Sequence, residues 1–227
     1  MEVIYEKFYK NPQYDSVWFK ENGKPVLCVD FADTASPAYT DIFEDIKGHA
    51  NLTDGQVNEF KEHFTFRNTL WPYQHNEKYD AVEPDDMSWI DWYYPQHISG
   101  KGFINVSVAQ HPAYAFSVSE HPEFRDIYYN RNRGRGWDYT TEENSHRNVL
   151  SGLNLENQWK TALDNLDKVD EVMVTGWNEW TAAKLTTYHS AYQGYVQFAD
   201  QFNMEFSRDL EMMADEDGYG DNFYLQN

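Results

Sequence analysis

The segment Trp177-Asn178-Glu179-Trp180 holds the residue types in this chain that are best suited to chemistry. Glu179 follows an apolar run and stands between two indoles, and such partly desolvated surroundings can keep a carboxyl protonated near neutral pH. A protonated carboxyl can act as a general acid. Asn178 can hydrogen-bond a hydroxyl, and the two tryptophan rings offer flat apolar faces. The alternative for Glu179 is a structural carboxylate that caps the following helix.

A second carboxylate would be needed for the cleavage of a glycosidic bond, which two carboxylates normally flank. Asp91 is the first candidate, because Trp89 and Trp92 stand on either side of it. Asp30 is the second candidate, at the end of the first apolar run. The third possibility is a carboxylate that precedes Met1 in a longer chain.

Other polar side chains stand where apolar runs end and are candidates for binding sugar hydroxyls. They are Arg67, Gln96, His97 and Gln110. The alternative for His97 is an ordinary surface histidine in a loop. The spacings of cysteine and histidine that are typical of zinc sites do not occur, and neither do glycine-rich phosphate loops, so we expect no metal and no cofactor. The serine-hydrolase pattern Gly-x-Ser-x-Gly is also missing.

The elements that must position these residues are short apolar runs, which predict five strands, and amphipathic segments, which predict helices. The strands are predicted at 25–30, at 64–67, within 87–94, at 102–109 and at 171–175, and the helices at 3–9, 53–63, 154–166 and 188–213. Such alternation is typical of an α/β fold with a parallel sheet. Functional residues of these folds collect at the carboxyl ends of the strands, so we expect the residues named above to face one cleft.

The predicted fold class is a glycosidase-type (β/α)8 TIM barrel that is incomplete, in a single domain over residues 1–227. A full barrel needs about 250 residues and eight strands, whereas this sequence shows five and has no strand pattern after Trp180. We therefore expect the chain to be the C-terminal part of a longer barrel, or a truncated reading frame. Because unpaired strand edges promote association, we expect the chain alone to be poorly soluble or dimeric.

The segment 121–146 reads as a loop and contains an island of basic residues in an acidic chain. The arginines are Arg125, Arg131, Arg133 and Arg135. We expect the run 130–136 to be a mobile, exposed surface loop. The alternative is a lid over the active face that donates arginines to substrate oxygens.

Composition excludes several classes of partner. The formal net charge of -20 repels phosphate backbones and anionic membrane surfaces, so a nucleic-acid partner is not expected. No stretch approaches the roughly 18 apolar residues of a membrane helix, so membrane insertion is not expected either. Aromatic residues make up 17% of the chain, enough to supply both a core and sugar-stacking surfaces. No signal peptide is visible and the location stays open, with a secreted or cell-surface protein favoured.

The motif Val174-Thr-Gly-Trp-Asn-Glu-Trp180 resembles the late-strand motif of glycosidase-like barrels related to the endo-mannosidase (family 99) and family 71 glycoside hydrolases. More narrowly, the chain is similar to a bacterial family with this barrel. The similar segments are 14–20, 23–26, 64–67, 94–97, 107–110, 152–154, 158–159, 206–209 and 220–226, so they span nearly the whole chain. The resemblance implies a glycosidase barrel that acts on carbohydrate.

Two departures from that family bear on activity. The family typically has Trp-Leu-Glu where this chain has Trp89-Ile90-Asp91, and a side chain shorter by one methylene moves the carboxyl by about 1 Å, enough to impair catalysis. Family members also have further sequence before the position of Met1. Two functions are therefore predicted. The first is a glycoside hydrolase that cleaves a polysaccharide or glycan by carboxylate acid/base catalysis, and the second is a catalytically silent carbohydrate-binding barrel.

Overall fold

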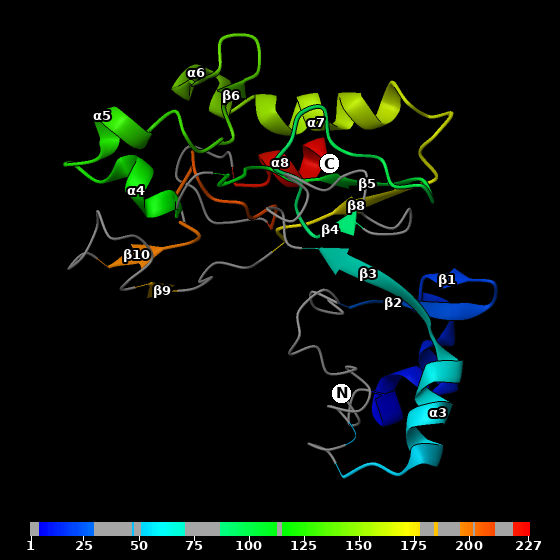
Figure 1. The fold of residues 1–227 in the computed structure, drawn as a ribbon. Coiled ribbons are helices and arrows are strands. Elements are labelled where there is room, and N and C mark those ends of the chain that lie inside the picture. The colour runs from blue at the N-terminus through cyan, green and yellow to red at the C-terminus, as the bar shows by residue number, and fades with distance from the viewer. Residues whose placement is uncertain are drawn as a thin grey trace. The chain divides into compact units, whose positions relative to one another are not determined.

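The computed structural model describes residues 5–29, 47, 51–70, 87–112, 115–177, 184–185, 196–201, 203–211 and 220–227. Contacts divide the chain into two compact units (Figure 1). The first comprises Met1–Leu70 with Asp85–Met87, and the second comprises Trp71–Pro84 with Ser88–Asn227. Two contact units can belong to one domain, so the single domain expected from the sequence stays a prediction.

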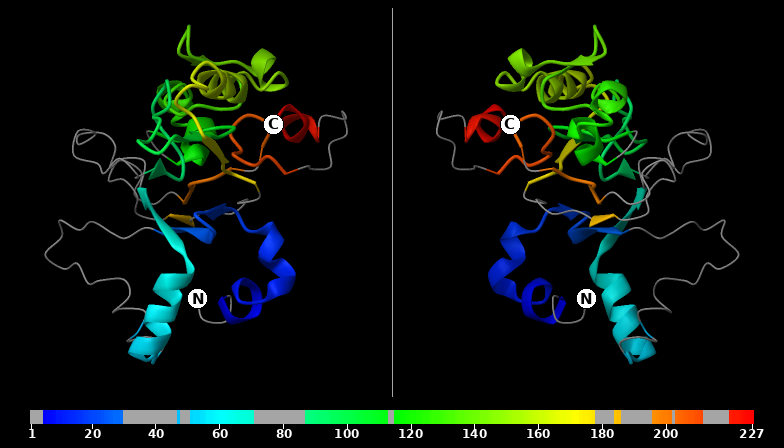
Figure 2. Two further views of the ribbon diagram at one scale, coloured as in Figure 1. Left: turned by 90° about the vertical axis from the view of Figure 1, so that its right-hand side faces the viewer. Right: turned by 90° about the vertical axis from the view of Figure 1, so that its left-hand side faces the viewer.

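The first unit is built around a parallel β-α-β arrangement. Its elements are η1 (Tyr5–Tyr9), η2 (Pro12–Val17), β1 (Lys20–Glu21), β2 (Lys24–Val29), α3 (Asp54–His63) and β3 (Thr65–Leu70), and the sheet order is β1-β2-β3-β4, with β4 at Met87–Ser88. β2 and β3 run parallel, with Val26 opposite Thr65, as the sequence predicts. Figure 2 shows η1 and η2, in blue, lying beside α3, in cyan.

Local sequence accounts for the ends of these elements. The β1–β2 hairpin turns through Asn22 and Gly23, whose φ angles of 51° and 80° are those of the turns that join antiparallel strands tightly. Thr53 begins α3 with a capping box, because its side chain accepts from the Gln56 backbone N–H while the Gln56 side chain accepts from the Thr53 N–H. The predicted helix at 53–63 is thus confirmed.

The second unit contains another parallel pair, β5 (Phe103–Val106) and β8 (Glu171–Val174), with Val106 opposite Val174. A long connection and the helix α7 (Leu153–Leu163) join the two strands. The shorter elements are α4 (Phe116–Glu120), α5 (Arg125–Tyr128), β6 (Trp137–Asp138), β7 (Glu143–Asn144), α6 (His146–Val149), β9 (Lys184–Leu185), β10 (Gln197–Phe198) and α8 (Asn222–Gln226).

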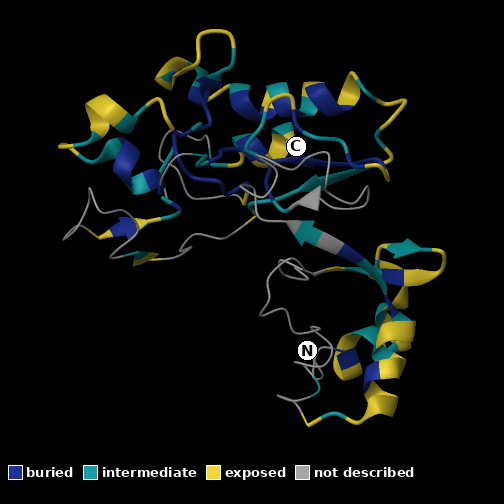
Figure 3. Cartoon of the chain, viewed as in Figure 1, coloured by how far each residue is buried: buried dark blue, intermediate teal, exposed yellow. Residues whose placement is uncertain are grey.

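The core of the second unit lies between its strands and helices. Figure 3 shows β5 buried along its length and α7 with a buried face. The largest apolar cluster joins residues from β5, α6, α7, α8 and the segments between them. Its buried members are Val106, Val108, Val149, Leu155, Leu210 and Phe223. The predicted strands at 102–109 and 171–175 and the predicted helix at 154–166 are therefore confirmed, with the first strand limited to Phe103–Val106 and the helix ending at Leu163. The barrel itself stays a prediction.

One predicted element is present but short, and another is wrong in the described residues. The strand predicted within 87–94 is confirmed but covers only Met87–Ser88, because the Asp91 side chain turns the chain into a loop by accepting backbone N–H groups. Of the helix predicted at 188–213, residues 196–201 and 203–211 contain β10 and turns and no helix. In that segment the Asn203 side chain accepts from two backbone N–H groups, an alternative to helical hydrogen bonding.

The prediction of an exposed loop at 130–136 is also wrong. Arg135 is fully buried, and its guanidinium donates to the carbonyl oxygens of Ser207 at 2.9 Å and Asp209 at 2.6 Å. Gly136 is packed so closely that a Cβ there would lie 2.2 Å from the Ser145 carbonyl oxygen. The guanidinium of Arg135 therefore anchors the C-terminal segment, and it is not placed to bind substrate.

Candidate functional site

The candidate site of the second unit is organised by the buried carboxylate of Asp91. Asp91 comes shortly after β4 in the chain, and it is only 3% exposed. One carboxylate oxygen accepts the backbone N–H of Tyr93 at 2.8 Å, and the other accepts the N–H of His97 at 2.7 Å. The carboxylate thus fixes the loop from 91 to 97, which places it in a positioning role.

Two opposing influences act on the pKa of Asp91. Burial raises this pKa, since an ionised carboxyl loses its hydration in the interior. The hydrogen bonds from His97 and Tyr93 and the charge of Arg133 work in the opposite direction, and burial prevails. A carboxyl with both oxygens occupied and little exposure has no free edge for a sugar, so the described geometry does not favour direct catalysis by Asp91.

Asn105, in the middle of β5, connects the Asp91 loop to both parallel strands. Its amide oxygen accepts the Asp91 backbone N–H at 3.2 Å. Its amide nitrogen donates to the Trp89 carbonyl at 2.8 Å and to the Met173 carbonyl of β8 at 3.2 Å. One buried side chain therefore ties together three segments of the chain that run side by side.

Gln110 extends this network beyond the carboxyl end of β5. Its amide nitrogen donates to the Asp91 carbonyl at 3.1 Å. Its amide oxygen accepts from Asn154 of α7 at 3.3 Å and from the hydroxyl of Tyr139 at 3.4 Å. Burial raises the pKa of Tyr139 to about 12, and its ring stacks on that of Tyr94 at 3.6 Å. Asp91 and Gln110 are thus brought together, as the sequence predicts.

Gln96 and His97 lie beside α7 and belong to the same network, since the His97 N–H bonds to the Asp91 carboxylate. The Gln96 amide nitrogen donates to the carbonyls of Asn105 and of Gln158 in α7, at 3.2 and 3.1 Å. Both residues line an open hollow of about 480 Å³ together with Tyr93, Pro95, Ile98, Thr161, Asn165 and Lys168. Burial lowers the pKa of His97, which favours the neutral ring.

Trp177 stands just beyond the carboxyl end of β8 and exposes 43% of its surface. The chain turns at Gly176, whose φ of 79° and close approach to the Arg208 carbonyl exclude a side chain. The Trp177 carbonyl accepts the Glu211 N–H at 2.9 Å, and its ring lies edge-on to Tyr224 with the ring centres 6.0 Å apart. A fixed backbone therefore presents an accessible indole directly before Asn178.

The remaining predicted site residues are not joined to this network in the described part of the chain. Arg67 belongs to the first unit, where it is buried and forms an ion pair with Glu21. Asp30, Asn178, Glu179 and Trp180 lie outside the described residues.

Sequence reasoning missed Arg208, which is buried with its guanidinium 5.1 Å from the centre of the Trp89 ring. Burial, with a contribution from this arginine, lowers the pKa of His111 to about 3, so that ring is neutral at physiological pH. The available signal was the run Phe206-Ser-Arg-Asp209, in which two charges follow an aromatic residue. It gave no indication that these charges are buried.

Asp200 supplies a further buried charge beside Arg208, at 3.4 Å from the arginine Nε. Burial raises the pKa of Asp200 to about 6, against the lowering effect of Arg208. The folded state therefore binds a proton more tightly than the unfolded state between the ordinary value of 3.8 and about 6. Stability from this group is greatest below pH 4 and is lost as pH rises to about 6.

We predict that titration of Asp200 lowers the free energy of unfolding by about 1–3 kcal/mol when the pH is raised from 4 to 7. Urea unfolding at both pH values would measure it, with Asp200→Asn expected to flatten the dependence. The exposed Asp167→Asn is the matched control and should keep the parent's slope. Equal slopes in the parent and Asp200→Asn would show that Asp200 does not titrate in this range.

Comparison of the chain with models of protein families, with curated proteins and with solved structures finds no match. The family resemblance drawn from the motifs therefore stays a prediction. None of the helices in the described residues is long and apolar enough to span a membrane. Within the same residues, no group of three His, Cys, Asp or Glu side chains is arranged to hold a metal ion.

Proposed function

We propose that the protein is a glycoside hydrolase-like protein that binds a polysaccharide or glycan at the carboxyl end of β8. In this proposal Glu179 is the acid/base, Asn178 binds a hydroxyl, and Trp177 is the stacking platform. The observation that carries it is the exposed indole of Trp177 at the end of a parallel strand, immediately before Asn178 and Glu179. Functional residues of parallel α/β folds collect at such strand ends.

Asp91 serves as a positioning residue in this function, because its two oxygens hold the loop from 91 to 97. The second catalytic carboxylate is then Asp30 or one supplied by a longer form of the chain. Gln110 supports the site by holding the Asp91 backbone.

The second candidate function is a catalytically silent carbohydrate-binding protein. The burial of Asp91 favours it, because this carboxylate is withdrawn from the role of direct catalyst. Both functions need the Trp177 surface, and they differ in whether bonds are cleaved. Assays of reducing-sugar release and of binding on the same soluble polysaccharides would separate them.

Trp177→Ala is predicted to weaken polysaccharide binding about tenfold. A stacked ring contributes on the order of 1 kcal/mol in addition to the free energy gained by burying its surface. Isothermal titration calorimetry with a panel of soluble polysaccharides would measure this loss. Phe19→Ala is the matched control, because it also removes an exposed aromatic ring, in the first unit. If no polysaccharide binds the parent, or if both variants bind as the parent does, the proposed sugar site is wrong.

A further inference from the structure

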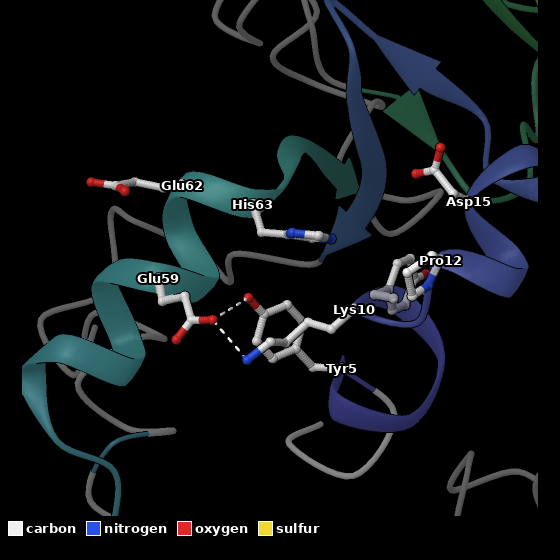
Figure 4. Close-up of a pocket in the computed structure, with 8 residues that line it drawn as sticks. Tyr5, Lys10, Pro12, Asp15, Glu59, Glu62 and His63 are labelled. Atoms are coloured by element: carbon white, nitrogen blue, oxygen red, sulfur yellow. Dashed lines mark hydrogen bonds and ion pairs between the residues drawn. The ribbon is translucent and has the colours of Figure 1, made fainter.

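The first unit contains an open cavity of about 610 Å³ between η1, η2 and α3 (Figure 4). Cavities of this size hold small organic ligands. Aromatic and apolar side chains form much of its wall, from Tyr5, Tyr9, Pro12 and His63. It belongs to a different unit from the proposed sugar site, so an inference about it does not depend on the proposed function.

The wall of this cavity is fixed by ring packing, so its shape does not depend on a ligand. Tyr9 stacks on Trp18 with ring centres 4.1 Å apart and meets Phe64 edge-on at 4.6 Å. Tyr5 meets His63 edge-on at 5.2 Å. Rings held in this way present preformed apolar surfaces, which limits the entropy lost when a ligand binds.

The charges around the cavity favour a cation. Asp15, Glu59 and Glu62 are among its lining residues, together with Lys10, and Lys20 pairs with Asp15 at 2.6 Å, so three acidic groups stand against two ammonium groups. Burial lowers the pKa of His63, so this ring adds no positive charge near neutral pH. An anionic ligand would therefore meet net repulsion, while a cation would be attracted.

Lys10 shows how the cavity accommodates an ammonium group. Its Nζ lies 2.8 Å from a Glu59 oxygen and 5.3 Å from the centre of the Tyr5 ring. The same Glu59 oxygen accepts the Tyr5 hydroxyl at 3.3 Å, so ring and carboxylate are held as one unit (Figure 4). A carboxylate joined to an aromatic face is the arrangement that binds organic ammonium ions.

We propose that this cavity binds a small organic ammonium ion, with its charge at Glu59 and its carbon body against the rings of Tyr5 and Tyr9. The ligand's ammonium competes with that of Lys10 for the Glu59 carboxylate. The proposal predicts that Lys10 weakens binding, whereas Glu59 and the rings strengthen it.

The test uses 1,5-diaminopentane as the probe and 1,5-pentanediol as its neutral counterpart, titrated into the whole chain at low ionic strength. Low salt is needed because Lys10 and Glu59 are partly exposed and their interactions are screened. NMR amide shifts or calorimetry would give the dissociation constants. The diamine is expected to bind at least tenfold more tightly than the diol.

Two variants should change diamine affinity in opposite directions. Glu59→Gln is expected to weaken binding about threefold to tenfold, since it removes the paired charge but retains the shape. Lys10→Met is expected to strengthen binding by a similar factor, since it removes the competing ammonium. The matched controls are Glu156→Gln and Lys184→Met, exposed residues of the second unit that give the same changes in net charge.

Thermal melts of every variant establish that the fold persists, and Lys10→Met provides a gain of binding that a misfolded protein would not show. Equal affinity for the diamine and the diol would overturn the proposal. So would a Glu59→Gln effect no larger than that of Glu156→Gln, because the attraction would then come from the acidic chain as a whole.

Discussion

Glu179→Gln is expected to lower the rate of sugar release per folded molecule by ~10²–10⁴-fold, the usual contribution of a positioned acid or base. Glutamine keeps the shape and hydrogen-bonding capacity of the side chain but cannot transfer the proton. Sugar affinity should change far less, because an amide can still bond to a hydroxyl. The measurement pairs product release with calorimetric binding on the same polysaccharide.

Two comparisons give this prediction its specificity. Trp177→Ala should show the opposite profile, with a loss of affinity that exceeds any loss of turnover in saturating substrate. Glu211→Gln is the matched control, because its backbone N–H contacts the Trp177 carbonyl while the residue lies outside the motif and is exposed. If Glu179→Gln sharply lowers the melting temperature while turnover per folded molecule is unchanged, Glu179 is a structural cap and the catalytic assignment fails.

The strands and helices that could be predicted are those whose signal is local. Apolar residues and β-branched side chains at 102–109 and 171–175 predicted strands, and the structure pairs Phe103–Val106 with Glu171–Val174 in parallel. A helix was predicted to begin at Thr53, whose residue type often caps helices, and the capping box of Thr53 with Gln56 confirms that start. Such patterns act over a few residues, so the sequence is enough to read them.

The errors arose where a side chain bonds to a distant part of the backbone. Arg135 lies in a glycine-rich basic run that has the composition of an exposed loop. Its guanidinium partners, the carbonyls of Ser207 and Asp209, are 72 and 74 residues further along the chain. No local pattern specifies such a contact, because it is formed by the packing of the C-terminal segment.

The candidate site was predicted in part for the same reason. The strand-end rule placed Asp91 and Gln110 near each other, and a hydrogen bond joins Gln110 to the Asp91 backbone. The role of Asp91 could not be read from its tryptophan neighbours, since burial and backbone donors decide it. Gln96 was expected near these residues, and its amide joins the same network by donating to the Asn105 carbonyl and to the Gln158 carbonyl of α7.

Asp91→Ala is expected to destabilise the protein by about 2–4 kcal/mol. The change leaves the part-buried N–H groups of Tyr93 and His97 without an acceptor, at about 1–3 kcal/mol for each unsatisfied donor. Relief of carboxylate burial offsets part of this cost, since burial raises the pKa of Asp91. Urea unfolding followed by fluorescence would measure the change in the free energy of unfolding.

Asp91→Asn is the informative companion, because one amide oxygen can still accept an N–H while the amide nitrogen opposes the other. Its destabilisation should be smaller than that of alanine but clear of the effect of the exposed control Asp167→Asn. A positioning role further requires that sugar release per folded molecule falls modestly and that added substrate partly restores the loop. If both Asp91 variants are as stable as the parent while sugar release disappears, Asp91 acts directly on the substrate. The hydrogen bonds from the Tyr93 and His97 N–H groups to its carboxylate must then break during turnover.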